Sequence, residues 1–260
     1  METQIASMLL MKDGTILGVG TDKQLYTKAT LDSRWVKIRV NGNLINVAVL
    51  DDGTLVAIEP LEYCGGCSDC KSGNYNLCSN EKFQMIGLTS NGGMAEQIIV
   101  PEHCLVKLDQ EIDPTTSCLI EPIAVAVHGY VITQTQSNHR VAVVGGGSIG
   151  QCAVFAAKAM GCEVDLHARY EHQMEAAELC NVKPPSGVYD RVVDCVGSAE
   201  SLETCVELLK PQGKIIGLAV AWDDIKLPGF GAINKEASPA VNSITMESVS
   251  LLNELNLSRR

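Results

Sequence analysis

A cluster of four cysteines is the first feature of this sequence that could do chemistry. The motif C-x2-C-x2-C-x7-C places Cys64, Cys67, Cys70 and Cys78 on a loop rich in glycine, serine and asparagine. The loop has no hydrophobic periodicity, so something other than an apolar core must hold it. Four thiolates on such a loop can surround a tetrahedral zinc ion, and four sulfur ligands leave no position open for a substrate. We therefore predict one structural zinc ion per chain.

Two other interpretations of these cysteines compete with zinc. A bacterial iron–sulfur cluster needs a shorter last spacing and a proline after the fourth cysteine, whereas Ser79 follows here. Unligated thiols or disulfides are the second alternative. The eleven cysteines of the chain are otherwise scattered, which fits reduced thiols and a cytoplasmic protein.

A glycine-rich turn follows an apolar segment and matches the motif G-x-G-x-x-G. Gly145 permits a tight turn, Gly147 lets the backbone approach a pyrophosphate, and Gly150 allows a helix to pack closely on a strand. Ser148 and Ile149 open the predicted helix, whose N-terminus favours negative charge. We predict that these five residues bind a dinucleotide, the alternative being a glycine-rich turn without a ligand.

The end of the next predicted strand bears on the choice of nucleotide. NAD-binding sites usually place a carboxylate there for the ribose hydroxyls, but this chain has Ala168 followed by Arg169. A guanidinium can bind a 2′-phosphate with two hydrogen bonds, whereas a carboxylate would repel it. We therefore expect NADP(H) to be favoured over NAD(H). In the alternative, Arg169 is a solvated surface residue and Asp165 serves the ribose.

Alternating helices and strands must position this turn. An apolar helix at 121–133 leads into a strand at 140–145, and the alternation that follows implies right-handed crossovers and a parallel sheet. The later helices are predicted at 148–160, 171–180 and 199–209, and the later strands at 163–168, 190–196 and 214–220. Val196 and Gly197, at the end of the third strand, are assigned to the cofactor site.

The first part of the chain has a different pattern. Short, roughly alternating apolar runs between residues 5 and 60, separated by turn signals, predict an antiparallel β region. The runs are 5–11, 35–40 and 44–50, the turn signals are 12–14, 41–42 and 51–53, and two further strands are predicted at 96–100 and 104–108. We place a domain boundary near residue 115, with a β domain over 1–115 and a dinucleotide-binding domain over 116–260.

Composition excludes several classes of function. The 260 residues include 20 Lys and Arg against 31 Asp and Glu, a net charge of −11 that disfavours nucleic acid and anionic lipid surfaces. No apolar run is long enough to span a membrane, and the N-terminus lacks the features of a secretory signal. We expect a cytoplasmic protein that acts on a small-molecule substrate.

Taken together, these motifs resemble the zinc-containing medium-chain dehydrogenase/reductase family, in particular its sorbitol and threonine dehydrogenase branch. The residues that carry the resemblance are 56–60, the four cysteines, 92–96, 119–128 and 145–150, and it fades after about residue 250. It implies an α/β protein with an N-terminal GroES-like β domain and a Rossmann doubly wound parallel sheet. It also implies a homodimer or homotetramer that assembles through the Rossmann domain.

The departures from that family concern its catalytic metal. Members with catalytic zinc carry Cys-Gly-x-Asp and Gly-His-Glu motifs ahead of the stretch at residue 56, and neither motif occurs here. Residues 1–63 contain no cysteine or histidine, and of that site only Glu121 in the Glu-Pro pair remains. A lone carboxylate does not hold zinc against cellular chelators, so we expect a shortened member without a catalytic metal.

Three functions are compatible with these features. We favour an NADP(H)-dependent oxidoreductase for a small carbonyl, imine or alcohol, with Glu121 as the first candidate for proton transfer because its site faces the nicotinamide in that family. Tyr63 is the second candidate, and Glu62 and His128 are weaker. For His128 we favour a role in the core or behind a metal ligand over catalysis, and the alternative for Tyr63 is packing against the zinc-binding lobe. The alternatives are a redox-neutral epimerase or lyase with retained NAD(P), and an inactive nucleotide-binding partner or scaffold.

Overall fold

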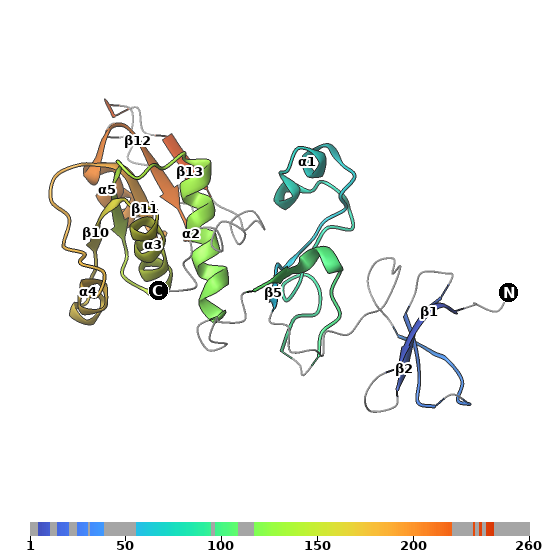
Figure 1. The fold of residues 1–260 in the computed structure, drawn as a ribbon. Helices are drawn as coiled ribbons and strands as arrows, with labels where there is room; N and C mark the ends of the chain where they lie inside the picture. The colour runs from blue at the N-terminus through green and yellow to red at the C-terminus, as the bar shows by residue number, and fades with distance from the viewer. Residues whose placement is uncertain are drawn as a thin grey trace. The chain divides into compact units, whose positions relative to one another are not determined.

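The computed structural model describes residues 5–10, 15–20, 25–30, 32–38, 56–94, 97–108, 117–219, 231, 234–235 and 238–241. The chain forms two compact units, Met1–Thr54 and Leu55–Arg260 (Figure 1). The domain boundary expected near residue 115 stays a prediction. Within the described ranges, every helix is too short or too polar to cross a membrane.

The first unit contains a four-stranded antiparallel sheet in its described residues, in the order β1-β2-β3-β4. Its strands are β1 (Ile5–Leu10), β2 (Ile16–Gly20), β3 (Leu25–Lys28) and β4 (Val36–Ile38). The Lys28 ammonium, at the end of β3, lies 4.9 Å from the centre of the Trp35 ring, just ahead of β4, a cation–π contact. The antiparallel prediction is confirmed for these strands, while the run at 44–50 and the three turn signals lie outside the described residues.

The second unit begins with two short antiparallel ladders. Strand β5 (Val56–Ile58) pairs with β8 (Leu105–Lys107), and β6 (Leu61–Glu62) pairs with β7 (Gln84–Met85). Three short helical segments, α1 (Ser68–Lys71), η1 (Tyr75–Leu77) and η2 (Glu102–Cys104), occur in the same region. The strand predicted at 104–108 is confirmed, but the one at 96–100 is wrong for residues 97–100, which form none. Pro101 follows them and has no N–H to extend a ladder.

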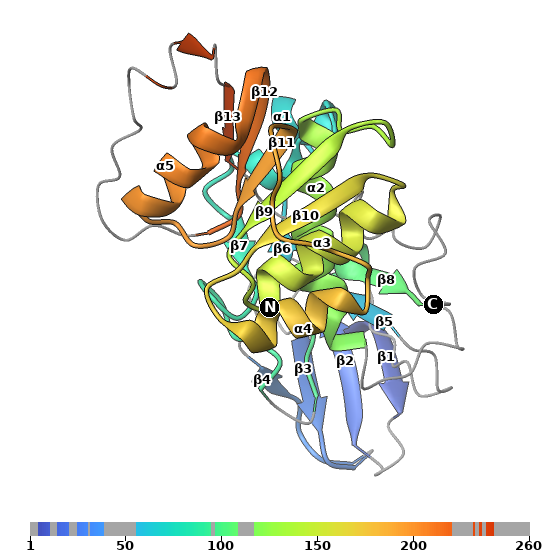
Figure 2. The ribbon, with the colours of Figure 1, turned by 90° about the vertical axis from the view of Figure 1, so that its left-hand side faces the viewer.

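A five-stranded parallel sheet in the order β10-β9-β11-β12-β13 forms the rest of this unit (Figure 2). Its strands are β9 (Arg140–Val144), β10 (Glu163–His167), β11 (Tyr189–Asp194), β12 (Leu209–Gly217) and β13 (Ser238–Val241). The helices are η3 (Ser117–Leu119), α2 (Ile120–Ile132), α3 (Ser148–Ala159), α4 (Glu171–Glu178) and α5 (Ala199–Leu208). Each predicted helix and strand from 121 to 217 is present, which confirms the α/β class.

Helices cover both faces of this sheet, and alternate residues of β9 accordingly belong to two different cores. Val141 and Val143 belong to a core that includes residues of α2, α3 and α4. Ala142 and Val144 belong to a second core with residues of α5. A strand that is buried on both faces has to be apolar throughout, which explains the uninterrupted run after Arg140.

The strand order reverses beside β9, and this reversal places the candidate site. The chain passes from β9 outward to β10 and then returns to β11 on the other side of β9. Ligands of open α/β sheets bind at such a switch point, outside the carboxyl ends of the strands. Gly145 follows β9 there, and Val196 lies just beyond the end of β11.

Candidate nucleotide site and cysteine cluster

The turn after β9 has the backbone that the glycine motif predicts. Gly145 has a φ of +101°, a conformation that side chains rarely adopt, and its N–H donates to the carbonyl of His167 at 2.8 Å. A Cβ on Gly145 would lie 2.6 Å from Cγ2 of Val196. Glycine is therefore required here, both by the backbone and by the close approach of the β11 turn.

Gly147 and Gly150 differ in what surrounds them. A Cβ on Gly150 would overlap the carbonyl oxygen of Gly145, so α3 packs directly on the turn. A Cβ on Gly147 would meet no atom within 4 Å. Because α3 begins at Ser148, the first N–H groups of the helix, at Ser148 and Ile149, have no acceptor inside it. The turn thus leaves donors and open space together, as a pyrophosphate site requires.

A buried aspartate shapes the neighbouring turn after β11. Asp194 is 4% exposed, and its Oδ1 accepts hydrogen bonds from the N–H groups of Val196 at 2.9 Å and Gly197 at 3.1 Å. Gly197 has a φ of +74°. Sequence reasoning missed Asp194, although an acid at the end of an apolar run and three residues before a glycine is a signal for a side-chain-stabilised turn.

Gln151, in the first turns of α3, was also missed. Its Nε2 donates to the carbonyl of Gly146 at 3.1 Å and to the carbonyl of Gln173, in α4, at 2.8 Å. A polar residue directly after Gly150, in an otherwise apolar helix, was the available signal. The glycine turn and the start of α4 are therefore joined through one side chain.

The residues expected to select the nucleotide lie at the end of β10. Arg169 is exposed, and Ala168 packs against the glycine turn, since a Cβ on Gly146 would lie 2.8 Å from Cβ of Ala168. Asp165 accepts from the Tyr189 hydroxyl at 2.7 Å and from Arg140 Nη2 at 3.4 Å. Arg140 and Tyr189 are the first residues of β9 and β11, so the Asp165 carboxylate binds side chains at the amino ends of the strands. A ribose would lie at the opposite, carboxyl ends, where this carboxylate cannot bind it.

Glu121 lies in the first turn of α2 and lines a cavity of about 160 Å³. The cavity is lined by Ala57, Ile58, Glu59, Pro60, Ser117, Cys118, Ile120, Glu121 and Ala124. Glu121 is an exposed residue, yet desolvation by the surrounding protein raises the pKa of its carboxyl group. Such a carboxyl group holds its proton to higher pH than a free glutamate does, which suits a proton donor.

Tyr63 does not line this cavity. Its ring contacts the rings of Tyr75 and His103, each with 4.5 Å between centroids. Desolvation raises the pKa of Tyr63, and the carboxylate of Glu59 adds to the shift. The structure thus brings Tyr63 against the cysteine-bearing segment, and it does not bring Tyr63 and Glu121 together in one pocket.

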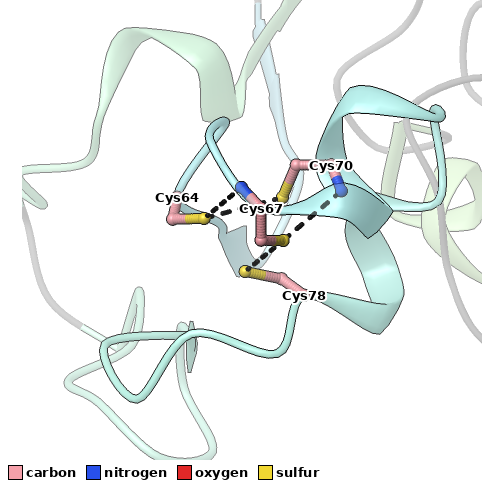
Figure 3. A group of neighbouring side chains, drawn as sticks. All are labelled: Cys64, Cys67, Cys70 and Cys78. Atoms are coloured by element: carbon pink, nitrogen blue, oxygen red, sulfur yellow. Dashed lines mark hydrogen bonds between the residues drawn. The ribbon is translucent and has the colours of Figure 1, made fainter.

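The four cysteines converge on a common centre (Figure 3). Their sulfur atoms all lie within 4.8 Å of one another, and Sγ of Cys64 is 3.9 Å from Sγ of Cys70. Cys67 and Cys78 show the same separation of 3.9 Å. Zinc–sulfur bonds of about 2.3 Å in a tetrahedron put sulfur atoms about 3.8 Å apart, so the donor set fits zinc.

Backbone donors favour thiolates within this cluster. The N–H groups of Gly66 and Cys67 point at Sγ of Cys64, at 3.4 and 3.3 Å, and lower its pKa. The N–H of Cys70 likewise lowers the pKa of Cys67, to about 6. Desolvation and the neighbouring sulfurs instead raise the pKa of Cys70 to about 12. A divalent cation would favour the thiolate form of all four cysteines at once, including Cys70, whose proton is otherwise held.

Comparison with known proteins agrees with this arrangement. The family model "Alcohol dehydrogenase GroES-like domain" matches residues 38–110. L-galactonate-5-dehydrogenase of Escherichia coli K12 is 32% identical over 188 residues, which cover 66% of this chain and 54% of that protein. Galactitol 1-phosphate 5-dehydrogenase of E. coli K12 is 25% identical over 214 residues, which cover 75% of this chain and 61% of that protein. The chain thus spans about half the length of the curated relatives it matches.

Solved structures share the fold. The crystal structure of galactitol-1-phosphate dehydrogenase from E. coli superposes with a TM-score of 0.71 at 20% identity, covering 93% of this chain and 73% of that one. The structure of 2R,3R-butanediol dehydrogenase from Bacillus subtilis gives a TM-score of 0.68 at 21% identity, covering 92% and 70%. With a GroES-like segment that carries a cysteine cluster, followed by a Rossmann sheet, the chain resembles the zinc-containing medium-chain dehydrogenase/reductase family.

Proposed function

We propose that this chain binds NADP(H) at the turn 145–150 and catalyses oxidation or reduction of a small alcohol, carbonyl or imine without a catalytic zinc. The observation that carries the proposal is the geometry at the switch point of the sheet. Gly145 and Gly150 close the turn, while the space beside Gly147 and the donors that open α3 stay available. A pyrophosphate fits these features.

The chain's own groups would then handle the proton and the orientation of the substrate. A bound nicotinamide supplies or accepts a hydride at its ring. Glu121 would donate a proton to the substrate oxygen or nitrogen during reduction and accept it during oxidation, and its raised pKa supports both roles. The apolar walls of the cavity would limit the access of water to the reacting atoms.

Zinc would have a structural role in this chain. In the described residues, the group of side chains placed to hold a metal is Cys64, Cys67, Cys70 and Cys78. Four sulfur ligands close the coordination sphere, so this ion would stabilise the loop and take no part in the reaction. A cytoplasmic location remains a prediction from the sequence, and a homodimer or homotetramer remains a prediction from the family resemblance.

Nucleotide titration tests the proposal. NADPH should bind more tightly than NADH, and Arg169→Ala should weaken NADPH binding by about tenfold while leaving NADH binding nearly unchanged, because a charged hydrogen-bonded pair is lost. Lys183→Ala, which removes another exposed cation of the same unit, is the control. Equal binding of NADH and NADPH to both Arg169 forms would contradict the preference, and failure of both nucleotides to bind would contradict the site.

A further inference from the structure

Three exposed side chains line up where β10 ends and α4 begins. The guanidinium carbon of Arg169 lies 5.7 Å from the centre of the Tyr170 ring. The rings of Tyr170 and His172 are nearly parallel, with an interplanar angle of 11° and 5.7 Å between their centroids. One cation and two stacked rings thus form a continuous row on the surface, beside the glycine turn.

This row contributes little to the hydrophobic cores. Tyr170 is 52% exposed, and neither core of the sheet includes Tyr170 or His172. A guanidinium that rests on an aromatic face is restrained before any ligand arrives, so binding an anion costs it less conformational entropy. In a chain with a net charge of −11, a preorganised cation of this kind is suited to a phosphate.

We propose that two residues add to the contact of Arg169 with the ribose 2′-phosphate, Tyr170 by positioning the guanidinium and His172 by a hydrogen bond of its own, an inference that rests on the nucleotide binding proposed above. Arg169 binds the phosphate oxygens, and a ring N–H of His172 donates a further hydrogen bond. Tyr170 is a positioning residue, because its ring holds the guanidinium in place. The preference for NADP(H) therefore depends on the ring pair as well as on the charge of Arg169.

Gln151 connects this subsite to the glycine turn. Its amide bonds the carbonyls of Gly146 and Gln173, and the N–H of Gln173 in turn donates to the carbonyl of Tyr170 at 3.1 Å. The spacing between the turn for the pyrophosphate and the row for the 2′-phosphate is thereby fixed. We assign Gln151 as a second positioning residue, one that acts through these carbonyls without touching the nucleotide.

Calorimetric titration with 2′-phospho-ADP-ribose and ADP-ribose isolates the subsite, because the two probes differ only in the 2′-phosphate. The wild-type chain should bind the phosphorylated probe about tenfold more tightly. Tyr170→Leu should lose most of this ratio, and Tyr170→Phe should keep it because the ring remains. His172→Ala should lower the ratio by about threefold, the loss of one hydrogen bond.

Gln151 is tested with the same two probes. Gln151→Leu removes both hydrogen bonds and should lower the ratio, whereas Gln151→Asn, which keeps the amide, should restore part of it. Leu179→Ala, at the exposed C-terminal end of α4, should leave the ratio and both affinities unchanged. Circular dichroism and melting temperatures establish that each variant is folded.

The outcomes separate this inference from the proposed function. If Tyr170→Leu and Gln151→Leu are folded and keep the wild-type ratio while Arg169→Ala loses it, the ring pair and Gln151 have no positioning role. If the wild-type chain binds both probes equally, the 2′-phosphate subsite does not exist, although the nucleotide site stands. If ADP-ribose itself does not bind, the proposed function fails and this inference fails with it.

Discussion

At the scale of single residues, Gly147 and Gly150 have opposite roles within one motif. Gly150→Ala places a methyl group against the carbonyl of Gly145 and should destabilise the fold by about 1–3 kcal/mol, the usual cost of overpacking. Gly147→Ala adds a methyl group to open space at a φ of −69° and should leave stability unchanged or slightly raised. Urea denaturation followed by circular dichroism measures both effects.

The same pair separates binding from folding. The methyl group of Gly147→Ala stands where the pyrophosphate must approach, so nucleotide affinity should fall by about tenfold or more in a fully folded protein. Undiminished NADPH affinity in Gly147→Ala would place the pyrophosphate elsewhere. Equal stability of wild type and Gly150→Ala would show that α3 can move away from the turn at no cost.

Glu121 should give the reaction its pH dependence. Because its pKa is raised, the protonated donor persists above the usual value of 4.5, and kcat/KM for reduction should fall as pH rises through the raised pKa. Oxidation uses the carboxylate and should rise over the same range. Glu121→Gln should remove both pH limbs and lower the rate by about 10²–10⁴-fold. Steady-state rates in both directions between pH 4 and 9 provide the measurement.

A stability measurement complements the rates. The folded chain holds the Glu121 proton more tightly than the unfolded chain does. Its contribution to stability is therefore greatest below the unfolded pKa and is lost as pH rises through the folded value. Glu121→Gln should flatten this decline. An unchanged pH profile of the rate in Glu121→Gln would assign proton transfer to another group.

Some of these residues were predictable from sequence and others were not. Gly145, Gly150 and the four cysteines are identified by spacing alone, because their roles depend on local geometry. Gln151 and Asp194 act through partners that folding supplies. The amide of Gln151, for example, reaches Gln173 on another helix. A sequence pattern marks such residues as unusual without naming what they bind.

At the scale of elements, Lys235 holds the C-terminal end of α5. Its Nζ donates to the carbonyls of Val206 at 2.6 Å and Glu207 at 2.9 Å, which the helix itself leaves without donors, and to the carbonyl of Leu209, the residue after the helix, at 2.6 Å. Lys235→Met keeps the apolar stem but removes these bonds, and should cost about 1–3 kcal/mol of stability. Chemical denaturation of the two proteins measures the difference.

Lys183→Met is the matched control for Lys235, because Lys183 is exposed on the same unit. It should change the free energy of unfolding by less than about 0.5 kcal/mol. If Lys235→Met also changed the free energy of unfolding by less than about 0.5 kcal/mol, water would replace the ammonium group at the helix end without a loss of stability.

The alternating helices and strands from 121 to 217 were predictable because their apolar periods differ clearly. Strand β13 was not, since Pro239 interrupts a short segment with little hydrophobic pattern. Proline is tolerated there because β13 lies at the edge of the sheet. Conversely, residues 97–100 end in three β-branched residues, which favour a strand, but form none ahead of Pro101. Whether a segment becomes a strand depended in both cases on a neighbouring strand to pair with, and sequence alone does not identify that neighbour. Strand β13 pairs with β12, whereas residues 97–100 form no strand.

At the scale of the whole molecule, the chain forms two compact units and matches about half of the length of its curated relatives. The galactonate and galactitol phosphate relatives are named for sugar-derived substrates. Under the function proposed above, a substrate of this chain would meet the lining of the cavity beside Glu121. The described lining includes two carboxyl groups, Glu59 and Glu121, and no lysine or arginine. Neutral polyols or imines should therefore be better substrates than sugar acids or sugar phosphates, as initial rates with matched pairs would reveal.

The metal content of the whole chain tests the central premise of a dehydrogenase without catalytic zinc. Mass spectrometry of the purified protein should find one zinc per chain, and Cys70→Ser should abolish it, because three sulfurs cannot close the tetrahedron. A chelator should destabilise the loop at 64–78, where only Cys78 is buried, and leave the Rossmann sheet folded. A second zinc that survives in Cys70→Ser would reveal a catalytic site built from ligands such as His103, Cys104 or His128. The absence of any zinc would instead leave the cysteine loop without its proposed support.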